Sequence, residues 1–162
     1  MTGSRAPRLS VATILNPRSV AVVGASEDLR KFGSRVLKNT IHGGFAGRII
    51  PVNPRREHIF GLPAVASVDR LANPVDVAVI AVPRTAVRDT ITQCAAIGVG
   101  CCVIITAGFS EIDGAGADLQ EELVQIARRA GMRLIGPNCL GLLNTHARLL
   151  LNSSPAMTVT PF

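Results

Sequence analysis

The stretch that decides the fold is Ser19-Val-Ala-Val-Val-Gly-Ala-Ser26, and Gly33 opens an apolar-periodic segment a few residues later. A continuous apolar run of this length predicts a buried parallel strand, and the segment over residues 33–41 predicts a helix. Backbone N–H groups at the start of a helix attract anions. Gly24 lets the chain turn tightly there with no side chain in the way. The sequence therefore predicts a phosphate-bearing ligand where the first strand ends.

Strand-like and helix-like segments alternate along the rest of the chain. The predicted strands are residues 20–23, 48–52, 76–82, 100–106 and 133–135, and the predicted helices are residues 33–41, 85–97 and 115–130. An irregular link with a short helical turn over residues 69–72 separates the second strand from the third. This alternation predicts a single α/β domain, a Rossmann-like, doubly wound, mainly parallel sheet with right-handed crossovers.

Each predicted strand ends in Gly, Pro or small polar residues. Ligands of an α/β sheet bind outside the carboxyl ends of its strands, so five such ends indicate one shared cleft. The candidate ligand-binding residues at these ends are Gly24, Ser26, Asn53, Val82, Pro83, Arg84, Thr106, Ala107, Gly108 and Asn138.

Length and composition bound the class of protein. The 162 residues are 48% hydrophobic and 17% charged, which suits one domain with a substantial core and argues against disorder. The apolar runs are too short to cross a bilayer, and residues 1–15 lack the apolar region of a signal peptide. We therefore expect an N-terminal extension over residues 1–15, a cytoplasmic location and no membrane partner.

The net charge of +6 is compatible with nucleic-acid binding. The chain has no Trp and no Tyr on which bases would stack, however, and its arginines are scattered. We expect no nucleic-acid partner. A small polyanionic ligand accounts for some of the arginines, and solvated surface accounts for the others.

Catalytic and metal-binding patterns are scarce, and we assign no catalytic residue and no metal site. The three histidines stand far apart and none lies beside a nucleophile: His42, His58 and His146. The four cysteines form no C-x-x-C pair, which favours buried apolar side chains: Cys94, Cys101, Cys102 and Cys139. Two alternatives stay open. Cys139 could be a thiol that faces the cleft, and Glu111 with Asp113 could be an acid–base pair rather than residues that begin the next helix or lie in solvent.

The first turn also lacks a dinucleotide-binding fingerprint. That fingerprint is G-x-G-x-x-G, whereas Gly24 is followed by no further glycine until Gly33. An NAD-binding redox domain is therefore the weaker alternative.

Six motifs, in order along the chain, carry a resemblance to a known family. They are Asn16-Pro-Arg-Ser-Val-Ala-Val-Val-Gly-Ala-Ser26, Gly47-Arg-Ile-Ile-Pro-Val-Asn-Pro54, Gly61-Leu-Pro63, Asp76-Val-Ala-Val-Ile-Ala-Val-Pro83, Ala107-Gly-Phe109 and Gly136-Pro-Asn-Cys-Leu-Gly141. Over residues 14–146 the chain resembles the CoA-binding domain of ADP-forming acyl-CoA synthetases, the superfamily of the succinyl-CoA synthetase α subunit. Succinyl-CoA synthetase has an acid where this chain has Ala107, so the chain resembles the acetyl-CoA branch.

The resemblance implies how coenzyme A is held. It implies a first loop that holds the CoA phosphates, made of Gly24, Ser26, Lys31, Phe32 and Gly33. Arg55 or Arg56 stands where the family has a basic residue after the second strand. Val82 and Pro83 match the apolar wall beside the adenine. Thr106 and Ala107 match the contact at the fourth strand, and Asn138 matches the Asn near the thiol end.

The family also implies partners. In the whole enzyme a phosphohistidine carries the phosphoryl group and an ATP-grasp domain handles the nucleotide, and neither resembles any part of this chain. We therefore expect residues 16–146 to form the CoA-binding domain of an acid–thiol ligase, inactive alone, with a tail or linker over residues 147–162. Its ligand is CoA or acyl-CoA, and a homo-oligomer is an option. The alternative from another class is a regulatory CoA-sensing module of a protein lysine acyltransferase.

Overall fold

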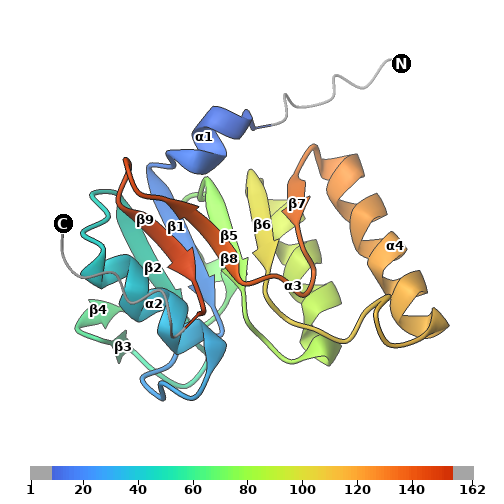
Figure 1. Ribbon diagram of the computed structural model, residues 1–162, viewed down its shortest axis with the longest axis horizontal. Coiled ribbons are helices and arrows are strands. Elements are labelled where there is room, and N and C mark those ends of the chain that lie inside the picture. The colour runs from blue at the N-terminus through green and yellow to red at the C-terminus, as the bar shows by residue number, and fades with distance from the viewer. Residues whose placement is uncertain (1–8, 155–162) are drawn as a thin grey trace.

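A five-stranded parallel sheet forms the centre of the computed structural model, which describes residues 9–154 (Figure 1). In spatial order its strands are β2 (Arg48–Val52), β1 (Ser19–Val23), β5 (Val77–Ile80), β6 (Cys101–Ile104) and β7 (Arg133–Ile135). This sheet confirms the predicted Rossmann-like α/β class. β5 and β6 end earlier than the sequence pattern predicts, because the residues that follow them turn into loops at the carboxyl edge of the sheet.

Three longer helices accompany the sheet, each within one residue of its predicted bounds: α2 (Phe32–His42), α3 (Arg84–Ile97) and α4 (Gly114–Ala130). Glycines in the left-handed region terminate two of them. Gly98 (φ 82°) follows α3 and Gly131 (φ 70°) follows α4, and each donates its N–H to carbonyls of the last turn. A short helix α1 (Val11–Leu15) and a 3₁₀ turn η1 (Val68–Arg70) complete the helical elements of the described residues.

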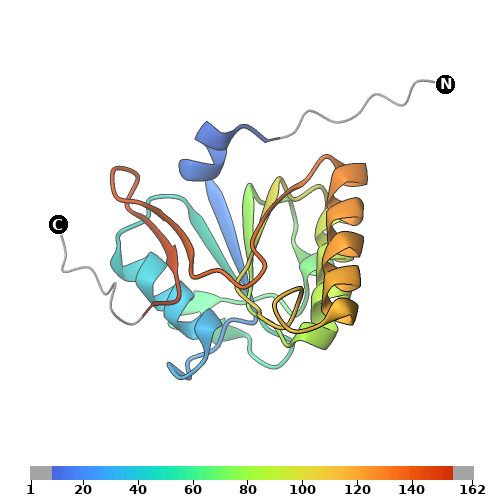
Figure 2. The ribbon, with the colours of Figure 1, turned by 45° about the vertical axis from the view of Figure 1, so that its right-hand side comes forward.

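The sheet separates two apolar clusters of buried side chains. Figure 2 shows α2 on one side of the strands and α3 with α4 on the other. Successive side chains of a strand point to opposite faces. Ala21 of β1 therefore packs in a cluster with residues of α3 and α4, whereas its neighbour Val22 packs with residues of α2 and with Leu149. Both faces of the central strands are covered, which explains why these strands read as unbroken apolar runs.

A hairpin of β8 (Gly141–Asn144) and β9 (Leu149–Asn152) covers the α2 side of the sheet. The sequence pattern assigns residues 147–162 to a tail, but Leu149 and Leu151 are fully buried. The hairpin is also bonded to α2, since the Asn39 side-chain amide donates to the Asn152 carbonyl at 2.9 Å. Residues 147–152 are thus packed against the domain, and residues 155–162 of the expected tail lie outside the described residues.

Residues 9–15, which the sequence assigns to an extension, also pack on the domain. Ile14 of α1 is 4% exposed, and Nε of Arg133 donates to the Leu9 carbonyl at 2.6 Å. The rest of the expected extension, residues 1–8, lies outside the described residues.

The link between β2 and β5, predicted to be irregular, contains a small antiparallel hairpin of β3 (His58–Ile59) and β4 (Leu62–Pro63). Its two turn residues, Phe60 (φ 49°) and Gly61 (φ 77°), both have left-handed backbone, as a two-residue hairpin turn requires. Phe is an unusual residue at such a position, so the pattern gave no hairpin signal.

Candidate functional site

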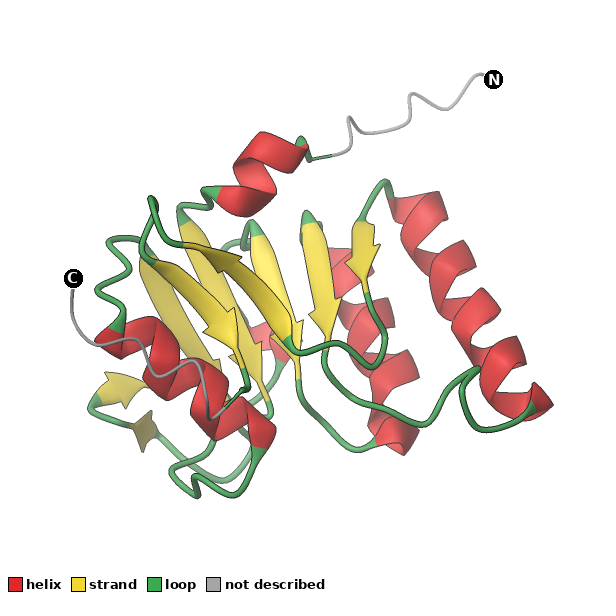
Figure 3. Cartoon of the chain, in the orientation of Figure 1, coloured by secondary structure: helices red, strands yellow, loops and turns green. Residues whose placement is uncertain are grey.

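The carboxyl ends of the five strands lie at the edge of the sheet away from α1, where loops gather in Figure 3. β1 stands between β2 and β5, so the chain leaves β1 toward β2 and later returns past it to β5. A reversal of this kind leaves a crevice between the two strand ends, which is the usual ligand site of an open α/β sheet. In this sheet that position lies between the ends of β1 and β5.

Gly24 lets the backbone of neighbouring strands meet closely at this position. Its φ is 89°, and a Cβ at this position would overlap the carbonyl oxygen of Ala81, which follows β5. Its own N–H donates to the carbonyl of Val52 at 3.1 Å. Only glycine combines this backbone conformation with so close an approach.

The amino end of α2 lies beside Gly24 and carries no side-chain cap. The N-cap residue Lys31 makes no capping hydrogen bond, and the first turn contains no acidic residue. In α4, by contrast, the carboxylate of Asp113 accepts from the N–H of Gly116 at 2.7 Å. The first N–H groups of α2 therefore keep both their bonding capacity and their positive potential, which suits an anion.

The loop between β1 and α2 is held in shape by its own polar side chains. The N–H of Asp28 donates to Oγ of Ser26 at 3.1 Å, and Arg30 bonds the Asp28 carboxylate at 2.9 Å. The Arg30 hydrogen bond lowers the pKa of Asp28 to about 2, so this carboxylate stays ionised. Phe32 is 53% exposed, and the Arg35 guanidinium lies 5.3 Å from the centre of its ring.

Asn53 braces the end of β2 against the end of β1. Its side-chain amide donates to the carbonyl of Ala25 at 2.7 Å, and its Oδ1 accepts from the N–H of Arg55 at 2.8 Å. Arg55 and Arg56 are exposed beyond this brace, and within residues 9–154 neither guanidinium makes an ion pair. The brace thus leaves two cationic side chains next to the strand ends.

Hydrogen bonds also join the ends of β5, β6 and β7. Oγ1 of Thr106 donates to the carbonyl of Val82 at 2.6 Å, and the N–H of Asn138 donates to the carbonyl of Thr106 at 3.1 Å. Arg84, at the start of α3, lays its side chain against Gly108. These hydrogen bonds and this contact therefore connect the ends of β5, β6 and β7 along this half of the carboxyl edge.

The structure brings every candidate residue to the carboxyl edge, in two groups. One group surrounds the ends of β1 and β2 and the start of α2: Gly24, Ser26, Lys31, Phe32, Gly33, Asn53, Arg55 and Arg56. The other lies at the ends of β5, β6 and β7: Val82, Pro83, Arg84, Thr106, Ala107, Gly108 and Asn138. The first group carries three cationic side chains, and the second carries one.

The open question about Glu111 and Asp113 is answered by their hydrogen bonds. Asp113 caps α4, and the carboxylate of Glu111 accepts from the N–H groups of Gly108 at 2.6 Å and Phe109 at 3.1 Å. Both carboxylates thus bond backbone groups, and they do not face each other as an acid–base pair would. The sequence pattern did not predict the hydrogen bonds by which Glu111 closes this loop. An acidic residue three positions after a turn glycine is the signal that would have indicated them.

The cysteines behave mainly as buried side chains. Burial raises the pKa of Cys101 to about 12, and a side-chain hydrogen bond with Cys94 together with burial raises the pKa of Cys102 further above its ordinary value. Cys139 is half-buried, its Sγ donates to the carbonyl of Ile104 at 3.3 Å, and burial raises its pKa too. None of these three thiols is poised as a thiolate.

The histidines remain isolated in the fold. His42 ends α2, His58 lies in β3 and His146 lies between β8 and β9, all of them exposed. Within the described part of the chain, no three His, Cys, Asp or Glu side chains gather as metal ligands do. In that same part, no helix is both long enough and apolar enough to span a membrane.

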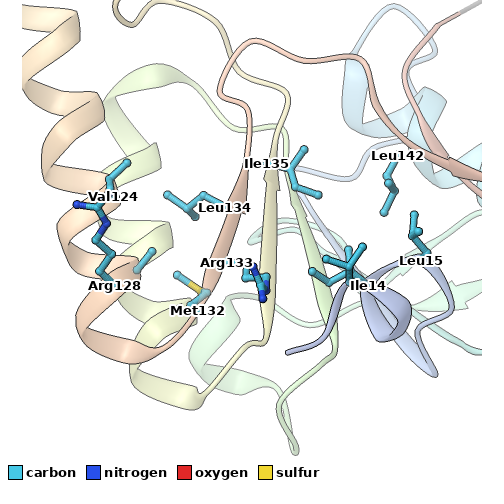
Figure 4. Close-up of a pocket in the computed structure, with 11 residues that line it drawn as sticks. Ile14, Leu15, Val124, Arg128, Met132, Arg133, Leu134, Ile135 and Leu142 are labelled. Carbon is cyan, nitrogen blue, oxygen red and sulfur yellow. The ribbon is translucent and has the colours of Figure 1, made fainter. Parts of the chain in front are cut away.

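An apolar groove of about 460 Å³ lies along the edge strand β7, between α1, α4 and β8 (Figure 4). Ile14 and Leu15 come from α1, Leu134 and Ile135 from β7, and Leu142 from β8. No residue of the candidate site lines this groove. The groove is therefore separate from the candidate site at the carboxyl edge.

Comparison with known proteins gives a family for this fold and site. A family model described as a CoA binding domain matches residues 18–145. The chain is 47% identical over 134 residues to the α subunit of an ADP-forming acetate–CoA ligase II from Pyrococcus furiosus, and 36% identical over 148 residues to an ADP-forming 4-hydroxybutyrate–CoA ligase from Nitrosopumilus maritimus. These matches cover 83% and 91% of this chain but only 29% and 21% of the two relatives.

A solved structure supports the same grouping. Acetyl-coenzyme A synthetase 1 from Ca. Korarchaeum cryptofilum, in complex with phosphate and ADP, matches with a TM-score of 0.86 and 41% identity. The match covers 90% of this chain and 31% of that one. The chain thus spans less than a third of these larger proteins.

Proposed function

The chain belongs to the CoA-binding domain family that ADP-forming acyl-CoA synthetases contain, and on this premise we propose that the carboxyl edge of its sheet binds CoA. The observation that carries the proposal is that an uncapped helix start and two exposed arginines lie together at the carboxyl ends of β1 and β2. CoA brings a diphosphate and a 3′-phosphate, and both kinds of group suit such a cationic site.

The distribution of cationic side chains along the carboxyl edge also favours one direction for CoA along that edge. The phosphate-bearing half of CoA lies against the first loop, the start of α2, and Arg55 with Arg56. The adenine lies beside Val82 and Pro83, and the pantetheine arm runs past Thr106 and Ala107, so that the thiol reaches the neighbourhood of Asn138. This order follows the family pattern and places the uncharged arm where the edge carries fewer cations.

We further propose that the domain acts in an acid–thiol ligase that joins an acid to CoA. Here CoA is a substrate, and the domain binds it and positions its thiol. The phosphohistidine and ATP-grasp parts of such a ligase complete the reaction, on the same chain or another. Relatives with similar sequences are ligases for acids as different as acetate and 4-hydroxybutyrate, so the acyl group is selected outside the features that this domain shares with them.

The two alternatives gain no support. The relatives compared above are CoA ligases or synthetases by name, rather than acyltransferases or dehydrogenases. An NAD site would also require a phosphate-binding turn with glycine spacing that the first loop lacks.

Calorimetric titration of the chain with CoA, NAD and ATP tests the proposal. We expect saturable CoA binding that NAD and ATP do not match, and weaker binding of 3′-dephospho-CoA because it lacks one phosphate. Binding of NAD in preference to CoA, or no CoA binding by a folded chain, would contradict it.

A further inference from the structure

The loop that follows β6 is closed by the side chain of Glu111. One carboxylate oxygen accepts from the N–H of Gly108 at 2.6 Å, and the other accepts from the N–H of Phe109 at 3.1 Å. The bond from Gly108, with smaller contributions from other backbone N–H groups and from nearby Arg84, lowers the pKa of Glu111, so the carboxylate is ionised at neutral pH.

The backbone that Glu111 holds is under constraint on both sides. Gly108 has a φ of 104°, and a Cβ at this position would lie 3.0 Å from Cδ of Arg84, so the Arg84 stem rests on the glycine. Phe109 is fully buried, and its carbonyl packs against Gly116 of α4. The Glu111 carboxylate thus fixes a short turn that lies between the buried Phe109 side chain and the aliphatic part of the Arg84 side chain.

This turn directly continues the segment that the proposed function puts against CoA. Thr106 and Ala107 precede Gly108, and Thr106 is bonded both to Val82 of the β5 loop and to Asn138 of the β7 loop. A change in the turn would therefore be transmitted to the surface on which the pantetheine arm lies. The ends of β1 and β2, where the phosphates would bind, share none of these hydrogen bonds.

We propose that Glu111 is a positioning residue for CoA. By holding the N–H groups of Gly108 and Phe109, it fixes the turn that supports the pantetheine arm. It also keeps the Arg84 side chain packed on Gly108. This inference rests on the proposed CoA-binding function. The negative charge of Glu111 has a second consequence. A fixed carboxylate at the end of β6 occupies the N–H pair that a phosphate would seek, which leaves the phosphates to the cationic half of the edge.

Two ligands separate this role from a general structural one. CoA contains the pantetheine arm, whereas adenosine 3′,5′-bisphosphate has the adenosine, the 3′-phosphate and the first 5′-phosphate of CoA but neither the second 5′-phosphate nor the arm. In the Glu111→Ala variant we expect CoA affinity to fall about tenfold. The affinity for adenosine 3′,5′-bisphosphate, whose adenine reaches this half of the edge only at Val82 and Pro83, should fall by less than about twofold. Glu111→Gln keeps one acceptor oxygen and should lose less CoA affinity than Glu111→Ala.

Glu122→Gln is the matched control, because the Glu122 carboxylate bonds Arg88 at 2.7 Å between α4 and α3 instead of bonding the backbone of the β6 loop. It should bind both ligands as the wild type does. Equal losses for the two ligands in Glu111→Ala would overturn the inference in favour of a structural role, and unchanged CoA affinity would overturn it outright. A folded wild-type chain that binds neither ligand would instead overturn the proposed function, and this inference with it.

Discussion

Gly33, in the first turn of α2, packs directly on the carbonyl oxygen of Gly24, and a Cβ at Gly33 would overlap that oxygen. The two glycines thus bring the start of a helix into contact with the end of the central strand. Because the carbonyl belongs to backbone, it cannot move aside as a flexible side chain would. The proposed phosphate site depends on this contact, since it sets where the first N–H groups of α2 lie.

Replacing Gly33 with Ala should therefore displace the start of α2. We expect a loss of about 1–3 kcal/mol in the free energy of unfolding, as for an overpacked core position. We also expect CoA binding to lose more free energy than folding does. Chemical denaturation and calorimetry measure the two. Gly114→Ala is the control, because a Cβ at the first residue of α4 meets no atom within 4 Å. Tight CoA binding by Gly33→Ala would show that the phosphates bind elsewhere.

The arginine pair after β2 gives a prediction about charge. Replacing Arg55 and Arg56 with Ala removes charge-assisted contacts worth about 1.5–3 kcal/mol each when desolvated, and less here because both side chains are exposed. We expect CoA affinity to fall at least about tenfold and its dependence on salt to weaken. Titrations at two ionic strengths measure both effects.

The adjacent pair Arg128 and Arg129, at the far end of α4, provides a matched double variant. Its replacement with Ala should leave CoA affinity and salt dependence as they are in the wild type. If both double variants bind CoA alike, Arg55 and Arg56 are only solvated surface.

The central strands could be predicted from sequence because their environment is simple. Residues of β1 such as Val22 are covered on both faces, and an unbroken apolar run signals that burial directly. Leu149-Leu-Leu151 is equally apolar, but its burial comes from α2, which precedes it by more than a hundred residues. A run of three apolar residues in the sequence gives no sign of that tertiary contact, so the pattern predicted a tail.

The candidate site, like the fold, could be predicted from the sequence only in part. Glycines and strand ends locate the carboxyl edge of the sheet, because a left-handed backbone at a position such as Gly24 favours glycine and can be inferred from the residue type. The braces were not foreseen, since Asn53 and Glu111 look like ordinary polar loop residues in the sequence. Their partners, the carbonyl of Ala25 and the N–H of Gly108, are set by where the loops lie in the fold.

The β8–β9 hairpin should contribute to the stability of the domain. Leu151 is fully buried between the sheet and α2, so Leu151→Ala should cost about 2–5 kcal/mol in the free energy of unfolding. Leu143 on β8 is 36% exposed, and Leu143→Ala should cost only about 0.5 kcal/mol. Denaturant unfolding compares the two variants. Equal, small losses would mean that residues 147–152 do not belong to the cooperative unit.

The cysteines offer a chemical test of where the CoA thiol lies. Alkylation requires a thiolate, and burial raises the pKa of both Cys101 and Cys139. Cys101 is fully buried, whereas Cys139 is half-buried in the loop that contains Asn138. In the native protein we expect iodoacetamide to modify Cys139 first and slowly, at a rate that rises with pH through the alkaline range, while Cys101 reacts only on unfolding.

Saturating CoA whose thiol is blocked by S-methylation, so that it does not itself consume iodoacetamide, should slow the modification of Cys139, because the proposed thiol end of the ligand lies next to Asn138. Adenosine 3′,5′-bisphosphate, which lacks the pantetheine arm, should leave the rate as it is in the free protein. Mass spectrometry of proteolytic peptides follows each cysteine separately, and Cys139→Ser identifies the signal. Protection by both ligands to the same degree would indicate that the phosphates, rather than the thiol, approach the end of β7, and the direction proposed for CoA along the sheet edge would then be reversed.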